Sequence, residues 1–156
     1  MEWEREAEQA TSVTRVAIVR TGLVLHPEGG ALAKMLPPFR LGGGGSIGSG
    51  RQWMPWIHRA DWVDLVRWMM AEPHARGAFN GAAPDPVRNT EFARALGRAL
   101  RRPAILPVPA LALRLLFGEM AEILLTGQRA MPARALEMGF RFRFQRLEDA
   151  LAHLFR

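Results

Sequence analysis

The sequence predicts an α/β fold in which the last part of a parallel sheet is followed by a small, mostly helical α+β region. Two observations support this. Residues 2–11 have the pattern of a polar, alanine-bearing helix. Residues 13–20 (VTRVAIVR) are rich in β-branched side chains, as buried parallel strands are. A helix that runs into such a strand is half of a parallel crossover unit. We therefore expect the neighbouring strands of the sheet to come from a preceding segment.

In the next part of the chain, glycine and proline residues predict loops and the end of a helix. Residues 21–30 are expected to form a loop, and residues 31–36 a short helix that ends at Pro37 and Pro38. Residues 41–50 (LGGGGSIGSG) have the composition of a flexible loop, and residues 53–58 that of a short extended segment.

Helical spacing predominates in the rest of the chain. Asp61 is a candidate N-cap for a helix whose apolar positions follow at i, i+3, i+4 and i+7: Trp62, Leu65, Val66 and Met69. Residues 77–81 indicate a short strand and 84–88 a loop, and Asn89 is a candidate N-cap for a helix through Leu100. After an extended piece at 104–108, helices are expected at 109–117, 119–125, 132–137 and 145–155, with an extended segment at 140–144.

Composition limits where the protein acts and what it contains. With 156 residues, of which 49% are hydrophobic, the chain can bury a core. It has no cysteine, which excludes disulfides and thiolate metal sites. No apolar run is long enough to cross a membrane, and the acidic start (MEWERE) is unlike a secretory signal. These features predict a cytoplasmic protein without a membrane partner.

The net charge of +6 comes almost entirely from arginine, because Lys34 is the only lysine among 21 basic residues. Such a charge can indicate nucleic-acid binding. The arginines are scattered along the chain without a nucleic-acid-binding motif, however, so we expect ordinary surface residues and no nucleic-acid partner.

Two classes of site find little support. The sequence contains no tyrosine, so a mechanism that needs a phenolic acid or base is excluded for this chain, and we assign no catalytic residue. The histidines have at most one nearby carboxylate, as in the pairs His58–Asp61 and Asp149–His153, whereas zinc needs at least three ligands. No metal site is predicted.

The glycine-rich stretch 42–50 differs from phosphate-binding loops. A P-loop continues with Lys and Ser or Thr into a helix, and the dinucleotide loop also leads directly into a helix. Here Gly50 is followed by Arg51 and Gln52 and then by an extended segment. We therefore expect a mobile loop over a cleft.

Residues 51–61 (RQWMPWIHRAD) carry the densest set of candidate binding side chains. Tryptophan and arginine together can form a pocket wall for a planar or anionic ligand. In the alternative interpretation, Trp53 and Trp56 pack in the core and Asp61 only caps the following helix. The sequence leaves both open.

Several stretches in the right order resemble one family. They are RTGLVL at 20–25, GGALAKMLPPF at 29–39, IGSGRQWMPWIH at 47–58, FN at 79–80, PVRN at 86–89, RPA at 102–104 and GQRA at 127–130. Together they resemble the epimerase-like family of atypical extended short-chain dehydrogenases/reductases, which carry a C-terminal domain of unknown function. The resemblance implies the C-terminal part of a Rossmann-type domain at 1–102 and the small domain at 103–156. It also implies that NADP or NAD binds to the complete protein.

The resemblance implies roles for two groups of residues. Thr21, Gly22 and Leu23 would lie at the nicotinamide end of the cofactor. A substrate-binding wall, for a small molecule whose identity the sequence does not give, would be formed by Arg51, Trp53, Trp56 and His58. Met54 stands where nucleotide-sugar epimerases carry an arginine, which implies a more apolar pocket.

The family's dinucleotide loop is absent from this sequence, and so is the region of the active-site tyrosine and lysine. We therefore expect a C-terminal fragment of an NAD(P)-dependent oxidoreductase or epimerase-like protein. Alone it would bind cofactor weakly or not at all and be inactive, and its partner would be the missing N-terminal half. The alternative is a non-catalytic interaction module, like the relatives described as cell-division inhibitors, acting through an exposed sheet edge.

Overall fold

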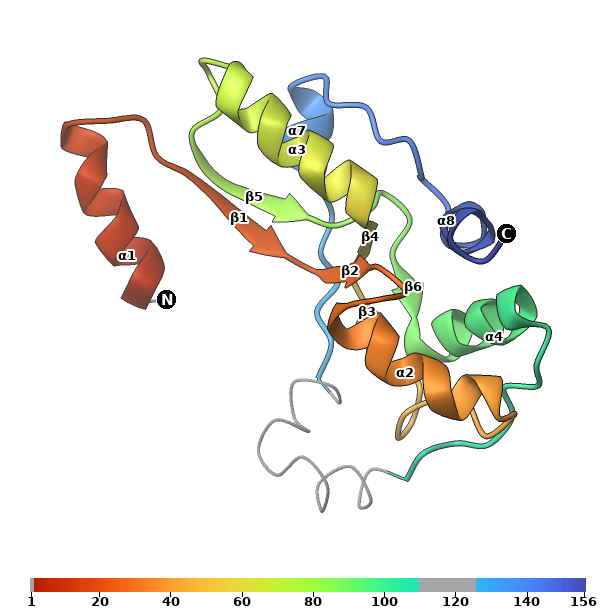
Figure 1. Cartoon of the computed structure of the whole chain (residues 1–156). Coiled ribbons are helices and arrows are strands. Elements are labelled where there is room, and N and C mark those ends of the chain that lie inside the picture. Colours follow the sequence, from red (N-terminus) through yellow and green to blue (C-terminus); the bar gives the residue numbers. More distant parts are fainter. Residues whose placement is uncertain (1, 110–125) are drawn as a thin grey trace.

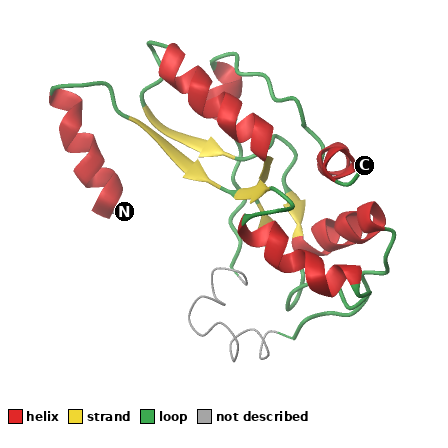
Figure 2. Cartoon of the chain, viewed as in Figure 1, coloured by secondary structure: helices red, strands yellow, loops and turns green. Residues whose placement is uncertain are grey.

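A computed structural model describes residues 2–109 and 126–156 of the chain. The helices expected at 109–117 and 119–125 fall outside these residues, apart from Pro109. The described chain is a mixed α/β structure in which short strand pairs are flanked by helices (Figures 1 and 2). The predicted α/β class is confirmed.

Two parallel strand pairs form the centre of the fold. Strand β1 (Ala17–Thr21) pairs with β5 (Gly77–Gly81), and Ala17 lies opposite Gly77. Strand β2 (Leu23–Leu25) pairs with β4 (Trp56–His58), and Leu23 lies opposite Trp56. A short antiparallel pair joins β3 (Trp53–Met54) to β6 (Val87–Arg88). Strands β2 and β6 arise where loops were predicted.

Helix α1 (Glu2–Gln9) continues as a 3-10 turn, Ala10–Ser12, and lies apart from the other helices in Figure 1. It is tied to β1 by a bidentate ion pair, in which Arg20 Nε and Nη2 lie 2.8 and 2.9 Å from the Glu4 carboxylate. The strand begins at Ala17, four residues later than predicted. The Arg15 guanidinium instead donates to the carbonyls of Met69, Met70 and Ala75 at the end of α3 (Arg59–Ala71).

Helix α2 (Gly30–Arg40) runs through Pro37 and Pro38, so the predicted stop at this pair was wrong. Each proline lacks an N–H group, but its carbonyl still accepts. Leu41 N donates to Pro37 O at 3.2 Å and Gly43 N to Pro38 O at 2.9 Å. Leu32, Leu36 and Phe39 are buried along one face. This packing outweighs the loss of two helical hydrogen bonds.

The cap of helix α3 also differs from the prediction. The side chain of His58 caps it, because Nδ1 accepts from Ala60 N at 3.0 Å. Asp61 is fully buried within the first turn, and its carboxylate accepts from Arg143 N at 2.8 Å and Phe144 N at 3.0 Å. These backbone groups therefore bond to a side chain, and residues 140–144 form no strand although an extended segment was predicted there.

The last elements pack onto the first part of the chain. Helix α8 (Leu147–Leu154) shares a core with α2 and α4 (Asn89–Leu100). Its buried residues include Leu32, Phe92, Leu96, Leu147 and Leu151. Helix α7 (Ala133–Glu137) and the buried Phe140 and Phe142 complete a second core beside β5 and α3. The division at residue 102 remains a prediction. Among the described helices, none has the length and apolar character needed to span a bilayer.

Candidate functional site

Where β1 ends, residues 21–23 lead into β2 and contact the ends of the neighbouring strands; we call these three residues the crossing. Gly22 N donates to Gly81 O at 3.0 Å and Leu23 N to Pro55 O at 2.6 Å, so the chain passes directly from β1 into β2. A Cβ atom on Gly22 would lie 2.5 Å from Pro55 O, which explains why glycine stands there. Open α/β sheets bind ligands outside the carboxyl ends of their strands. Thr21, Gly22 and Leu23 therefore occupy a position suited to ligand contact.

Thr21 is the exposed member of this crossing. Its Oγ1 accepts a hydrogen bond from Trp62 Nε1 at 3.2 Å, which joins the end of β1 to helix α3. Trp62 was expected to be a core residue of α3; it lies against the second core and places its indole N–H at the sheet edge.

The glycine-rich loop, for which a mobile cover was predicted, is hydrogen-bonded to the start of α4 and packed against its neighbours. Gly50 O accepts from both Thr90 N and Thr90 Oγ1, each at 3.0 Å, and Ile47 N donates to Asn89 Oδ1 at 2.6 Å. Cβ atoms at Gly44 and Gly45 would clash with the Phe39 ring and the Leu106 backbone. The glycines thus permit close packing. Asn89 anchors this loop and is the first residue of α4, whose N-cap is Arg88 and not Asn89 as predicted.

Arginine side chains surround the half-buried Trp53. The Arg88 guanidinium carbon lies 3.7 Å from the indole centroid and that of Arg129 5.3 Å, both within cation–π range. Residues 127–131, which include Arg129, run past β3 and the end of β5. Gly127 packs against the Trp53 backbone, where a Cβ would clash, and Asn80 Nδ2 donates to Met131 O at 2.9 Å.

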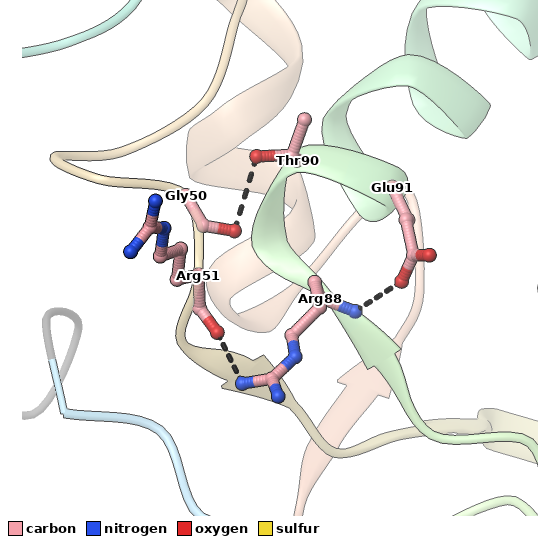
Figure 3. A pocket seen from close by; sticks show the side chains of 5 residues that line it. All are labelled: Gly50, Arg51, Arg88, Thr90 and Glu91. Atoms are coloured by element: carbon pink, nitrogen blue, oxygen red, sulfur yellow. Dashed lines mark hydrogen bonds between the residues drawn. The ribbon is translucent and has the colours of Figure 1, made fainter.

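Beside this cluster lies a shallow hollow of about 380 Å³, lined by Gly50, Arg51, Arg88, Thr90 and Glu91. Figure 3 shows that the Arg88 guanidinium reaches the Arg51 carbonyl, while Arg51 extends its side chain away from Arg88. Glu91 accepts from Arg88 N at 2.6 Å. Two guanidinium groups against one carboxylate favour an anionic ligand group here.

The four residues predicted to form a substrate-binding wall separate into two pairs. Arg51 is exposed and Trp53 half-buried near this hollow. Trp56 has no exposed surface and its Nε1 donates to Asp85 O at 3.0 Å, while His58 is only 4% exposed. Trp56 thus follows the alternative in which it packs in the core. Sequence reasoning missed Arg88 and Arg129, although both lie in stretches that carry the family resemblance.

His58 meets a histidine that is 95 positions away in the sequence. Its Nε2 lies 3.2 Å from His153 Nδ1 on α8, and the Phe144 ring packs on both imidazoles, with centroids 4.0 and 4.8 Å away. Because His58 Nδ1 accepts from Ala60 N, the neutral ring carries its proton on Nε2 and donates it to His153. Burial, followed by the charges of His153, Arg59, Arg143 and His26, lowers the pKa of His58 to about 4.

This histidine pair predicts acid sensitivity. The pKa of His58 is about 4 in the folded chain and ordinarily 6.5, so the unfolded chain binds more protons between these values. The free energy of unfolding should therefore fall as the pH drops from about 6.5 to 4, by up to about 3 kcal/mol from this group. Urea unfolding at pH 7 and pH 4.5 measures the loss. His58→Gln should flatten the profile relative to His74→Gln, an exposed control. Equal profiles would contradict the assignment.

Comparisons with known proteins bear on the family and the fold of the chain. A family model described as a domain of unknown function (DUF1731) matches residues 108–154. The chain is 47% identical over 150 residues to an Arabidopsis thaliana protein, "Epimerase family protein SDR39U1 homolog, chloroplastic", covering 96% of the chain and 43% of that protein. It is also 47% identical to the Mus musculus epimerase family protein SDR39U1, covering 96% of the chain and 51% of the relative.

A solved structure of human epimerase family protein SDR39U1 (isoform 2) with NADPH superimposes with a TM-score of 0.87 at 43% identity. The match covers 90% of this chain and 48% of the human chain. The chain thus spans about half the length of the relatives that it matches.

Proposed function

Because the chain corresponds to the C-terminal half of an epimerase-family protein of the extended short-chain dehydrogenase/reductase type, we propose that it forms the substrate-side wall of an NAD(P)-dependent oxidoreductase or epimerase. The crossing of Thr21, Gly22 and Leu23 at the carboxyl ends of the parallel strands is the observation that carries this proposal. The human relative that superimposes on this chain is the one solved with NADPH, which makes NADP the cofactor we propose for the complete protein.

The residues of this chain fit the nicotinamide end of the cofactor. Thr21 offers an exposed side chain and Gly22 a tight backbone crossing at the sheet edge. The pyrophosphate end needs a glycine turn that leads from a strand directly into a helix. In residues 2–109 and 126–156 the glycine-rich loop instead packs against α4 and Phe39. The pyrophosphate would thus be held by residues that precede this chain in its longer relatives.

The bound cofactor would supply or accept hydride, while this chain would position the substrate. An anionic group of the substrate would enter the hollow that Arg51 and Arg88 line, and Trp53 would pack on the planar or apolar part. Leu23 and Met54 are partly buried and pack against the same apolar core. Apolar side chains at these positions disfavour a sugar diphosphate as the substrate. The chain has no tyrosine, so it contributes no phenolic proton donor.

The preceding half is the partner that we propose. Among the described strands, β1 pairs only with β5, which leaves its other edge open to a further strand. Helix α1 is held to this strand by the Glu4–Arg20 ion pair, in the place of a crossover helix. A strand added beside β1 would continue the parallel sheet and bring a dinucleotide loop to the same edge as Thr21.

Variants at the crossing test this proposal in the protein with its preceding half restored. Thr21→Val removes the hydroxyl and should weaken NADPH binding severalfold, about 1 kcal/mol, and Gly22→Ala should weaken it further because the added Cβ displaces Pro55. Thr11→Val, at an exposed position of the 3-10 turn, is the matched control. Calorimetry gives the dissociation constants and circular dichroism verifies the fold. Unchanged affinity in both variants would refute a cofactor role for the crossing.

A further inference from the structure

A second basic hollow lies at the opposite end of α4 from the Arg51–Arg88 hollow. It has a volume of about 430 Å³ and is lined by Arg94, Gly97, Arg98, Arg101, Arg102, Pro103, Ala104 and Ile105. We call it the arginine groove. Arg94 and Arg98, at i and i+4, share one face of α4, and Arg101 follows directly after the last residue of the helix. Neither the proposed cofactor site nor the substrate wall includes these residues.

Arg101 stands in a backbone conformation that normally belongs to glycine. Its φ is 54° and its ψ 41°, and among the described residues it is the only non-glycine with positive φ. Glycine is the usual residue directly after a helix in this conformation. An arginine there is strained, and strained residues cluster at ligand sites. The turn itself is well formed, since Arg101 N donates to Arg98 O at 3.0 Å and Arg102 N to Gly97 O at 2.9 Å.

Within residues 2–109 and 126–156, carboxylates compensate little of the positive charge of the groove. Of the four arginines of the groove, only Arg98 has a carboxylate partner among the described residues. This is Glu148 on α8 at 3.3 Å, and both side chains are about half exposed. Arg94, Arg101 and Arg102 are exposed without a carboxylate partner in the described chain. Four arginines line this one hollow, and guanidinium groups suit the binding of phosphate oxygens.

The floor of the groove is apolar and held in place by close backbone packing. A Cβ on Gly97 would lie 2.6 Å from Ala104 Cβ and 2.9 Å from Arg102 O, so glycine lets segment 102–104 fold back on α4. Ile105, at the end of this segment, is 78% exposed. An apolar surface beside four arginines suits a ligand with both a multiply charged part and an organic part.

We propose that the arginine groove binds a small polyphosphorylated molecule, with Arg94, Arg101 and Arg102 holding its phosphates and Ile105 contacting its organic part. The site is separate from the cofactor-binding edge. Since Arg98 also bonds to Glu148, a bound polyphosphate would compete with the link between α4 and α8.

Titration of the 156-residue chain with inorganic tripolyphosphate at low ionic strength tests the proposal. We expect saturable binding with one site per chain, weakened by added salt, and tighter binding of adenosine triphosphate than of tripolyphosphate. Arg94→Ala should weaken tripolyphosphate binding about tenfold, the loss of one charge-assisted hydrogen bond. Arg67→Ala removes another exposed arginine, from α3, and should leave binding unchanged.

Arg101→Gly separates binding from folding. Glycine relieves the strain of the positive φ, so this variant should melt about 2 °C higher while it binds tripolyphosphate about tenfold more weakly. The proposal is overturned if binding does not saturate, if Arg67→Ala weakens it as much as Arg94→Ala does, or if Arg101→Gly binds like the original chain. It is also overturned if a short DNA duplex binds and tripolyphosphate does not compete with it, which would make the groove a nucleic-acid surface.

Discussion

Replacing Trp56 with alanine is expected to lower the free energy of unfolding by about 4 kcal/mol, the range found for large aromatic residues in cores. The side chain has no exposed surface, and it packs with Leu25, Leu32 and Phe92 in the core that joins α2, α4 and α8. The substitution also leaves Asp85 O without the indole donor that lies 3.0 Å away. Urea denaturation monitored by circular dichroism gives the change.

Trp53→Ala is the matched comparison, because the two tryptophans are three positions apart and have opposite environments. Trp53 is half-buried beneath Arg88 and Arg129, so its loss should cost about 1 kcal/mol of stability. In the protein with its preceding half restored, this variant should reduce substrate turnover more than stability. If both variants lost equal stability, the division into one core and one site tryptophan would be wrong.

Asp61→Ala is expected to destabilise the chain by about 3 kcal/mol, since two partly buried backbone N–H groups would lose their acceptor. These groups belong to Arg143 and Phe144, which Asp61 fastens to the start of α3. The carboxylate has no exposed surface, and burial raises its pKa despite the two hydrogen bonds. These two hydrogen bonds therefore link the start of α3 to the segment between α7 and α8, which a helix cap would not do.

Asp61→Asn distinguishes this link from simple packing. Asparagine keeps one oxygen acceptor and removes the desolvated charge, so it should lose less than half as much stability as alanine. Thermal unfolding of both variants beside Asp64→Ala, whose ion pair with Arg143 is more exposed, provides the comparison. Equal losses at positions 61 and 64 would show that the two N–H bonds of Asp61 contribute little.

Local sequence patterns predicted the strands and helices whose buried side chains recur at the regular spacing of that element. The β-branched run predicted strand β1, and the apolar spacing predicted α3, α4 and α8. Patterns failed where distant residues decide the structure. Leu32, Leu36 and Phe39 keep α2 helical through two prolines, and Asp61 bonds to residues 143 and 144 instead of capping its own helix. The short strands β2 and β6 depend on partners at β4 and β3 that a local pattern does not contain.

The candidate site was predictable only in outline. Thr21, Gly22 and Leu23 were placed at the cofactor end by resemblance, and the crossing at Pro55 and Gly81 gives a physical reason for the glycine. Arg88 and Arg129 were missed because their proximity to Trp53 depends on a strand pairing and on a segment that crosses the sheet edge. The His58–His153 contact likewise joins positions with no local signal between them.

We propose that this chain contacts the nicotinamide end of the cofactor and that the preceding half holds the pyrophosphate. Calorimetric titration with NADPH, of this chain alone and of the chain joined to its preceding half, tests this directly. The crossing that we propose for the nicotinamide side lies in this chain, whereas the glycine-rich loop packs against α4. We therefore expect saturable NADPH binding by the joined protein and little or none by the chain alone. Tight, saturable binding by the 156-residue chain alone would contradict this, because it would require a complete cofactor site within the chain.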